Sequence, residues 1–254
     1  MKYGPIIIYK RIGETPLEAM EKARFNHPEW EKLPMTYAGR LDPVAEGLLL
    51  VLAGEDCKEK DKYLDLTKEY ELSVLFGFET DTYDLLGRVM GVEISKPIVE
   101  KNLIDQALKN FTGEVEQDYP PYSSKPVDGK PLFQIAREGG LADIEIPKHK
   151  VKISKIDILE EKTISKDDLL KHVRSVVSSV DGDFRQEEIL KDWERFIGES
   201  EINEFPIVKI LVSCGSGAYM RTIAHELGKV LGVKSIAYHI KRTKIGEYDI
   251  KSVK

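Results

Sequence analysis

The sequence predicts an α+β fold: a mixed, largely antiparallel β-sheet with flanking helices and long loops, in which residues 1–254 form a single domain. Apolar segments of strand length recur along the whole chain, and they are joined by helical patterns or by long loops. They lack the strict alternation of strand and helix that marks parallel α/β folds. The composition, 41% hydrophobic and 32% charged, is that of a folded chain with a sizeable core.

The N-terminal part of the chain is expected to hold one helix among three strands. The sequence Thr15-Pro16-Leu17-Glu18 opens the helix, because Thr15 can cap the first turn while Glu18 reaches back to it, and the helix continues to about Asn26. The intervening segments 34–47 and 79–87 are expected to be loops. Strands are expected at residues 4–9, 48–53 and 70–76.

The C-terminal part is expected to combine strands and helices around a proline-rich segment. Residues 117–131 contain too many prolines for a regular element and are expected to form an extended ordered loop. Two amphipathic patterns at about 165–198, joined by a turn at Asp181-Gly182, predict a helical hairpin inserted between strands. Further helices are expected at residues 98–111, 132–137 and 218–231, and strands at residues 151–158, 205–212 and 235–240.

No segment has the pattern of a membrane span or a secretion signal. The longest apolar run, Leu48–Ala53, is far shorter than the roughly 20 residues that cross a bilayer. Near the N-terminus, Ile6–Ile8 is interrupted at once by Tyr9-Lys10-Arg11, which leaves no signal-peptide core. We therefore expect a cytoplasmic protein with no membrane partner.

Cysteine content and charge narrow the possible chemistry further. Cys57 and Cys214 lie far apart and belong to no metal-ligand pattern, so we expect structural thiols and no metal site. The 38 basic and 44 acidic residues give a formal net charge of −6, which argues against indiscriminate binding to phosphate backbones. RNA recognition would need a pocket with locally placed cations.

Three side chains are candidates for chemistry. Asp42 precedes Pro43 in a glycine-bracketed loop; such an aspartate is usually a turn former, but beside an arginine in a dry pocket it can act as nucleophile or base. Arg221 follows the glycine-rich turn 214–217 into a helix, a setting that suits close packing or anion binding. Tyr70 on its strand is either a core aromatic or a platform for stacking a base.

Five segments in a fixed order narrow these alternatives. They are residues 39–49 (GRLDPVAEGLL), 68–70 (KEY) with 76–87, 117–139, 212–228 and 240–243 (IKRT). Together they resemble the characteristic motifs of pseudouridine synthases of the TruB type, the tRNA T-loop enzymes. The resemblance spans about residues 4–248 apart from the helical hairpin. One such motif would be weak evidence, whereas five in order are specific.

The resemblance implies a fold, an activity and a set of site residues. It implies a sheet of the pseudouridine synthase type and isomerisation of one RNA uridine, uridine 55 of the tRNA T-loop, by an aspartate-dependent, cofactor-free mechanism with base flipping. Asp42 would be the catalytic carboxylate, Arg221 would pair with it, and Tyr70 would stack on the uracil and assist the deprotonation at C5. The protein would act as a monomer on RNA. The implied RNA-binding residues are Arg40, Lys68, Asp84, Tyr122, Arg137, Lys241 and Arg242.

The sequence also departs from the family pattern. Tyr37 stands where the family usually has a histidine, and the segment Lys10–Pro16 lacks the proline and serine of the early K-P-x-G-x-T-S motif. The family's C-terminal RNA-binding extension is not expected here, and the hairpin at about 165–198 is additional. Acidic residues in that hairpin argue against a plain phosphate contact and favour partner contact or a solvated surface. These departures affect the choice of target more than the chemistry.

Three hypotheses follow. The first is a synthase that acts on the T-arm of tRNA, and the second is a synthase that modifies a different uridine of tRNA, rRNA or mRNA. The third is an RNA-binding or folding module without catalysis, for which Asp42, Tyr70 and Arg221 would have no joint purpose.

Overall fold

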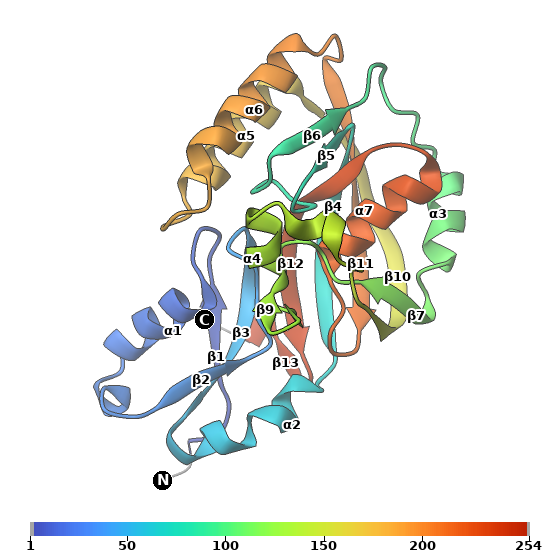
Figure 1. Cartoon of the computed structure of the whole chain (residues 1–254). Coiled ribbons are helices and arrows are strands. Elements are labelled where there is room, and N and C mark those ends of the chain that lie inside the picture. Colours follow the sequence, from blue (N-terminus) through green and yellow to red (C-terminus); the bar gives the residue numbers. More distant parts are fainter. Residues whose placement is uncertain (1–2, 253–254) are drawn as a thin grey trace.

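A computed structural model describes residues 3–252, which are built around a nine-stranded sheet (Figure 1). All pairs in this sheet are antiparallel except β3 with β12, so the predicted mixed, largely antiparallel sheet is confirmed. β2 (Met35–Ala38) pairs with β3, and β13 (Tyr248–Asp249) pairs with β12. The strand order is β1 (Ile6–Lys10), β3 (Ala45–Ala53), β12 (Ser235–Ile245), β4 (Lys68–Phe76), β11 (Glu204–Cys214), β10 (Lys148–Ser165) and β7 (Gly113–Asp118).

β3 is continuously apolar from Leu48 to Ala53, where both of its faces are covered. Leu48 and Leu50 pack toward α2 (Lys60–Leu64) and β13, whereas Leu49 and Val51 pack toward α1 (Pro16–Phe25). A strand buried on both faces reads as a continuous apolar run instead of an alternating one. The predicted capping box opens α1: Thr15 accepts from the backbone of Glu18, whose carboxylate accepts from the Thr15 backbone.

Two helices cover one face of the central strands. α7 (Met220–Leu231) and α3 (Lys101–Lys109) contribute Ile223, Leu227 and Ile104 to a core shared with β4, β10 and β11. β4 alternates accordingly, with Leu72 and Val74 in this core. Because α7 starts directly after the turn that follows β11, its N-terminus lies at one end of the central strands.

The predicted helical hairpin is confirmed as α5 (Lys166–Ser178) and α6 (Gln186–Glu199). Ser165 caps α5 by accepting a hydrogen bond from the backbone of Asp168. The buried ring of Trp193 packs 4.9 Å from that of Phe78, which also packs against Phe205. The hairpin is therefore fastened to the sheet and to the small β5 (Phe78–Thr80) and β6 (Val89–Val92) pair by its own apolar core.

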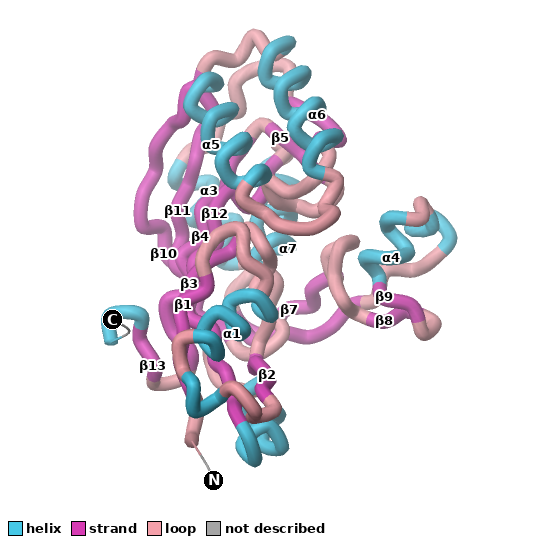
Figure 2. The backbone as a smooth tube through the Cα atoms, turned by 90° about the vertical axis from the view of Figure 1, so that its left-hand side faces the viewer, coloured by secondary structure: helices cyan, strands magenta, loops and turns pink. Residues whose placement is uncertain are grey.

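Residues 119–147, here called the arm, extend away from the sheet (Figure 2). The arm holds β8 (Pro126–Val127), β9 (Lys130–Pro131) and α4 (Leu132–Arg137). The helix at 132–137 matches the predicted bounds. Of the expected extended loop at 117–131, residues 117–118 end β7, residues 119–125 are a loop, and residues 126–131 form a short β-hairpin.

Several elements differ from the sequence prediction. β2 lies within the segment 34–47 that was expected to be a loop, and β6, β7 and α2 were not expected. β10 runs to Ser165 because it pairs with β11 along nearly its whole length, although its second half alternates poorly. The short 3₁₀ helices are η1 (Pro28–Trp30), η2 (Gly54–Glu59), η3 (Gly140–Asp143) and η4 (Ile250–Ser252). Between residues 3 and 252, none of the helices has the length and apolar character to cross a membrane.

Candidate active site

A cavity of about 730 Å³ lies where the β2–β3 loop, β4, the loop after β5, the base of the arm and the start of α7 converge. Its size falls within the range of pockets that enclose a small organic group. Lys241 is the one sequence-predicted site residue that does not line it. The predicted residues in its wall are Arg40, Asp42, Lys68, Tyr70, Asp84, Tyr122, Arg137, Arg221 and Arg242.

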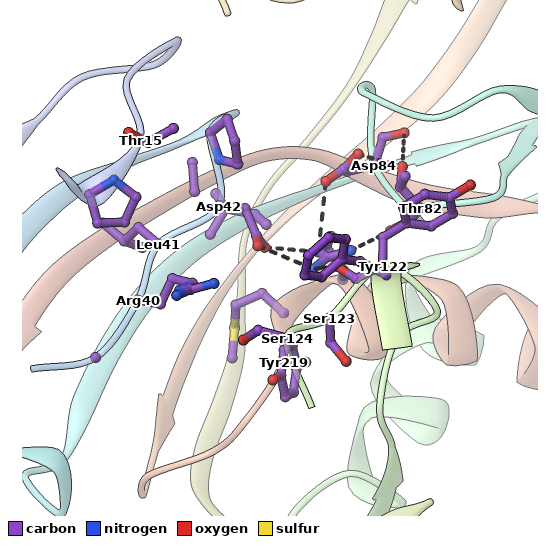
Figure 3. Close-up of a pocket in the computed structure, with 18 of the residues that line it drawn as sticks. Thr15, Arg40, Leu41, Asp42, Thr82, Asp84, Tyr122, Ser123, Ser124 and Tyr219 are labelled. Atoms are coloured by element: carbon purple, nitrogen blue, oxygen red, sulfur yellow. Dashed lines mark hydrogen bonds and ion pairs between the residues drawn. The ribbon is translucent and has the colours of Figure 1, made fainter. Parts of the chain in front are cut away.

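Asp42 and Arg221 both line this cavity and are bonded to each other; they are here called the floor pair. Figure 3 shows Asp42 with dashed lines for its hydrogen bonds. Nε of Arg221 donates to Oδ2 of Asp42 at 2.8 Å, and Nη2 donates to Oδ1 at 3.1 Å. The arginine side chain is 3% exposed and the carboxylate 31% exposed. The two-pronged contact fixes the carboxylate plane while leaving part of it open to the cavity.

Arg221 is itself oriented by backbone carbonyls. Its Nη1 donates to the carbonyl of Thr82 at 2.8 Å, and its Nη2 also donates to the carbonyl of Tyr122 at 3.2 Å. These carbonyls come from the loop after β5 and from the base of the arm. The guanidinium therefore has one possible orientation, which directs its remaining donors at Asp42.

The buried side chain of Lys10 is hydrogen-bonded to the loop that carries Asp42. Lys10 is inaccessible to solvent, and its Nζ donates to the carbonyls of Pro43 and Ala45 at 3.2 and 2.5 Å. Burial lowers the pKa of Lys10 to about 8, and the charge of Asp42 opposes that shift. At neutral pH the ammonium ion is thus present to anchor the loop and to stabilise the negative charge of Asp42.

The phosphate contacts predicted for Arg242 and Lys68 do not match the positions of these two side chains. The sequence analysis expected both to contact RNA phosphates, but their side chains are buried. Arg242 donates to the carbonyls of Leu48 and Gly39 at 2.7 and 3.0 Å, and Nζ of Lys68 donates to the carbonyl of Leu64. Arg242 therefore uses its donors on carbonyls inside the protein, and Lys68 uses at least one of its donors in the same way. Both cations stabilise the cavity wall and lie away from the exposed surface where a phosphate would approach.

A glycine explains how close the two strands of this wall lie. A Cβ at Gly47 would stand 2.3 Å from the carbonyl oxygen of Arg242, and its φ of +115° is one that other residues rarely adopt. Gly47 therefore lets β3 approach β12 directly beneath the Asp42 loop.

Asp84 is a second carboxylate beside Arg221. It is 4% exposed, its Oδ2 lies 3.7 Å from Nε of Arg221, and its Oδ1 accepts from the Thr82 hydroxyl at 2.6 Å and from the Leu86 backbone at 2.9 Å. Burial raises the pKa of Asp84 to about 6, Arg221 opposes the shift, and the charge of Asp42 adds to it. Asp84 thus shapes the loop after β5 and faces Arg221, and its side chain also lines the cavity. Its contact with RNA stays a prediction.

Tyr70 lines the cavity from β4 and is 8% exposed. Burial raises the pKa of its hydroxyl, so the phenol is protonated at neutral pH. The ring is therefore available for stacking, whereas accepting a proton would require an ionised form that burial disfavours.

Comparison with known proteins decides the family. The sequence model of the TruB family pseudouridylate synthase (N terminal domain) matches residues 31–182. The chain belongs to the TruB family.

Individual relatives agree with this assignment. The tRNA pseudouridine synthase B of Caldicellulosiruptor saccharolyticus is 30% identical over 98% of this TruB-family chain and 69% of the relative. That of Endomicrobium trichonymphae is 33% identical over 98% of this chain and 87% of the relative.

Solved structures share the fold of this TruB-family chain. A crystal structure of a Cbf5-Nop10-Gar1 complex superposes with a TM-score of 0.58 at 18% identity, over 98% of this chain and 50% of the matched chain. An H/ACA RNP bound to a substrate RNA containing 2′-deoxyuridine superposes with a TM-score of 0.54 at 17% identity, over 97% and 49%. The chain spans about half the length of these matched chains.

Three cations of the TruB-family site remain accessible. Arg40 and Arg137 are exposed at the cavity rim, and Lys241 is half-buried on β12 outside the cavity. Nη2 of Arg137 donates to the carbonyl of Asp183 at 2.5 Å, which joins α4 of the arm to the end of the helical hairpin. These are the predicted cations whose placement still suits contact with RNA.

The described part of the chain contains two free thiols, Cys57, which is partly exposed, and Cys214. Cys214 is buried, and burial raises its pKa to about 12, so it is a structural thiol, as the sequence analysis expected. Within residues 3–252, no cluster of three or more histidine, cysteine or acidic side chains could hold a metal ion.

The sequence analysis missed some residues of the site. The support by Lys10 is one, although this residue stands in the altered early motif. The carbonyls of Thr82 and Tyr122 are others, because backbone atoms leave no mark in a sequence. Arg185 of the helical hairpin also lines the cavity, and no motif points to it.

Proposed function

We propose that this protein isomerises a uridine of RNA to pseudouridine and that its substrate is uridine 55 in the T-loop of tRNA. The floor pair carries the proposal, because a half-open carboxylate held by a buried arginine in a TruB-family cavity is suited to attack a bound nucleotide. The names of the relatives, tRNA pseudouridine synthase B, support tRNA as the substrate.

The proposed reaction rearranges one bond of the nucleotide. The Asp42 carboxylate attacks the uridine or its ribose, and the bond between N1 and C1′ breaks. The freed uracil turns so that C5 bonds to C1′. The proton lost from C5 is balanced by one gained at N1, and Asp42 is released unchanged. The net change is an isomerisation, which needs no redox cofactor.

Each cavity residue has a defined role in this proposal. Arg221 keeps Asp42 ionised and oriented through their two hydrogen bonds. Tyr70 stacks on the uracil, and its protonated phenol makes the proton transfer from C5 a task for another acceptor such as solvent. Lys10 and Arg242 hold the backbone on either side of Asp42.

The cavity requires the uridine to leave its stack. Extruding a nucleotide costs a few kcal/mol, and contacts outside the cavity must offset this cost. Arg40 and Arg137 stand at the rim for this purpose, Tyr122 offers a ring at the base of the arm, and Lys241 is a peripheral contact. In this proposal one copy of the protein binds one tRNA in the cytoplasm.

Tritium release from RNA labelled at uridine C5 tests the proposal directly, because isomerisation must lose that hydrogen. The substrates are unmodified tRNA and an isolated T-arm stem-loop. About one equivalent of tritium per tRNA is expected from the wild-type protein, and none from Asp42→Asn. Asp157→Asn is the matched control, since Asp157 pairs with Lys155 on exposed β10.

The same assay separates the alternatives. Release from total cellular RNA but not from tRNA would keep the chemistry and reject the T-arm target. Tight tRNA binding without release from any RNA would leave a binding or folding module.

A further inference from the structure

The helical hairpin reaches the catalytic cavity. Its end, residues 179–186, is here called the hairpin tip, and Figure 1 shows this loop extending from α5 and α6 toward α4 and the β1–α1 connection. Three residues of the tip line the cavity: Asp183, Phe184 and Arg185. Most of the acidic side chains of the hairpin are exposed, as a solvated surface requires, while this end of the hairpin also lines the cavity.

Arg185 forms a two-pronged ion pair with Asp81, here called the rim pair. Nη1 lies 2.6 Å from Oδ2 of Asp81, and Nη2 lies 3.3 Å from Oδ1. The two side chains are 24% and 19% exposed. Asp81 also accepts from the backbone of Arg88 at 2.9 Å, so its carboxylate joins the hairpin tip to the loop after β5.

The same guanidinium covers a ring of the arm. Cζ of Arg185 lies 4.5 Å from the centroid of the Tyr122 ring, a distance at which a planar cation is attracted to the face of an aromatic ring. Arg185 thus binds two segments at once, Asp81 by charge and Tyr122 by its ring.

These two segments supply the carbonyls that orient Arg221. The carbonyl of Thr82, the neighbour of Asp81, accepts from Nη1 of Arg221, and the carbonyl of Tyr122 accepts from Nη2. A displacement of either segment would therefore turn the guanidinium that holds Asp42. Within the rim pair, Asp81 is the sequence neighbour of Thr82, and Arg185 lies against the ring of Tyr122. The rim pair therefore touches both segments whose carbonyls orient Arg221.

The hairpin tip is built to hold this position. Arg185 has a left-handed backbone with φ of +63°, which a residue other than glycine adopts only when its surroundings fix it. The Gln186 side chain accepts from the Phe184 backbone at 2.9 Å and donates to the carbonyls of Val180 and Gly182 at 2.9 and 2.8 Å. The loop is thus cross-linked by its own hydrogen bonds, in addition to its contact with Asp81.

The tip also packs against the N-terminal segment. A Cβ at Gly13 would stand 2.4 Å from the carbonyl oxygen of Ser179, so the two backbones are in direct contact. The backbone of Gly13 donates to the carbonyl of Pro43 at 2.9 Å, beside Asp42. The hairpin therefore abuts the Asp42 loop as well as the two supports of Arg221.

We propose that Arg185 is a positioning residue of the isomerisation site, which holds the Thr82 and Tyr122 carbonyls so that Arg221 presents Asp42 to the nucleotide. The proposal rests on the proposed function for its catalytic consequence. In this proposal the end of the hairpin is a functional part of the cavity wall.

Steady-state tritium release with Arg185→Ala, measured over a range of tRNA concentrations, tests this role. Small displacements of catalytic groups can cost up to about a hundredfold in rate, so the expected result is a kcat about tenfold to a hundredfold lower with KM within about threefold. Arg185→Lys, which keeps the charge, should recover part of the rate. Asp81→Asn should match Arg185→Ala, and the double variant should lose little more, because both act through one contact.

The matched control is Arg174→Ala. Arg174 pairs with Glu194 on the same hairpin at the exposed surface, away from the tip, so its removal should leave kcat and KM unchanged. An unchanged kcat for Arg185→Ala would overturn the proposal. So would a raised KM with unchanged kcat and a weaker salt dependence, which would make Arg185 a simple phosphate contact.

Amide hydrogen exchange tests, without any catalytic readout, whether Arg185 holds the segments that contain Asp81 and Tyr122. Arg185→Ala should speed exchange at residues 80–88 and 119–127 by about tenfold, while exchange in β4 and β11 stays unchanged. Unchanged exchange in both segments would overturn the proposal. A wild-type protein inactive on every RNA would reject the proposed function alone, since the exchange result would still decide whether Arg185 holds these segments.

Discussion

The floor pair and the rim pair are arginine–carboxylate pairs in different settings, one inside the cavity and one at its edge. In the floor pair, Arg221 is 3% exposed and has carbonyl partners besides Asp42. In the rim pair, Arg185 is 24% exposed and lies against an aromatic ring. The floor pair joins segments that carry family motifs, whereas one half of the rim pair comes from the hairpin. In our proposals the floor pair supplies the chemistry and the rim pair supplies its alignment.

The floor pair is more buried than the rim pair at its arginine, and this difference should determine how much each substitution lowers activity or stability. A guanidinium removed from water needs all its partners, because each unsatisfied buried group is costly. A pair near the surface can exchange a lost partner for water, and it contributes little stability. The two pairs should therefore respond differently to the same type of substitution.

Asp42→Asn breaks the floor pair at its reactive end and should have the largest effect. The amide keeps the shape of the side chain but cannot act as the nucleophile, so we expect the rate to fall by more than about a thousandfold. Tritium release from tRNA measures this loss, and circular dichroism verifies the fold. Residual activity within tenfold of wild type would remove Asp42 from the mechanism.

Arg221→Met compares the two pairs in stability. It leaves the buried Asp84 without its cation, so we expect a loss of about 3–5 kcal/mol in the free energy of unfolding. Arg185→Met should cost about 1 kcal/mol or less, since the rim pair is partly hydrated. Urea denaturation of both variants gives the comparison, and equal losses would contradict it.

Asp84→Asn sharpens the comparison through pH. The pKa of Asp84 is raised to about 6 in the folded protein, above its unfolded value near 3.9. Its contribution is therefore fully present below about pH 4 and is lost as the pH rises through 6, by up to about 3 kcal/mol. The variant should lack this decline. Urea midpoints at pH 4 and pH 7 measure it, and parallel profiles would contradict the burial argument.

The exposed Arg40 and Arg137 and the buried Arg242 should differ in how they affect the salt dependence of tRNA binding. This is the smallest of the expected effects. Neutralising Arg40 or Arg137 should lower the slope of log K for tRNA binding against log salt by about 0.7–0.9 each. Arg242→Gln should leave the slope unchanged and lower stability instead, because its donors bind carbonyls inside the protein. A changed slope for Arg242→Gln would restore its expected phosphate contact.

Secondary structure was predictable where local chemistry is complete. The capping box at Thr15, the apolar run of β3 and the amphipathic hairpin helices were all recognisable from neighbouring residues. β2 was missed because a four-residue strand in a loop is specified by its pairing with β3. β7 was missed because Val115 is its one apolar side chain; as an edge strand it is specified by its pairing with β10.

The sequence alone determined the family, the sheet type and the main residues that line the cavity, because family motifs mark Asp42, Tyr70 and Arg221. Only the tertiary structure decided which cations are buried and which face solvent, since a basic residue in a motif has the same letter in both settings. It also decided that Arg185 meets Asp81, 104 residues away. Such contacts depend on how the hairpin packs against the sheet, which is a property of the whole core and not of any local pattern.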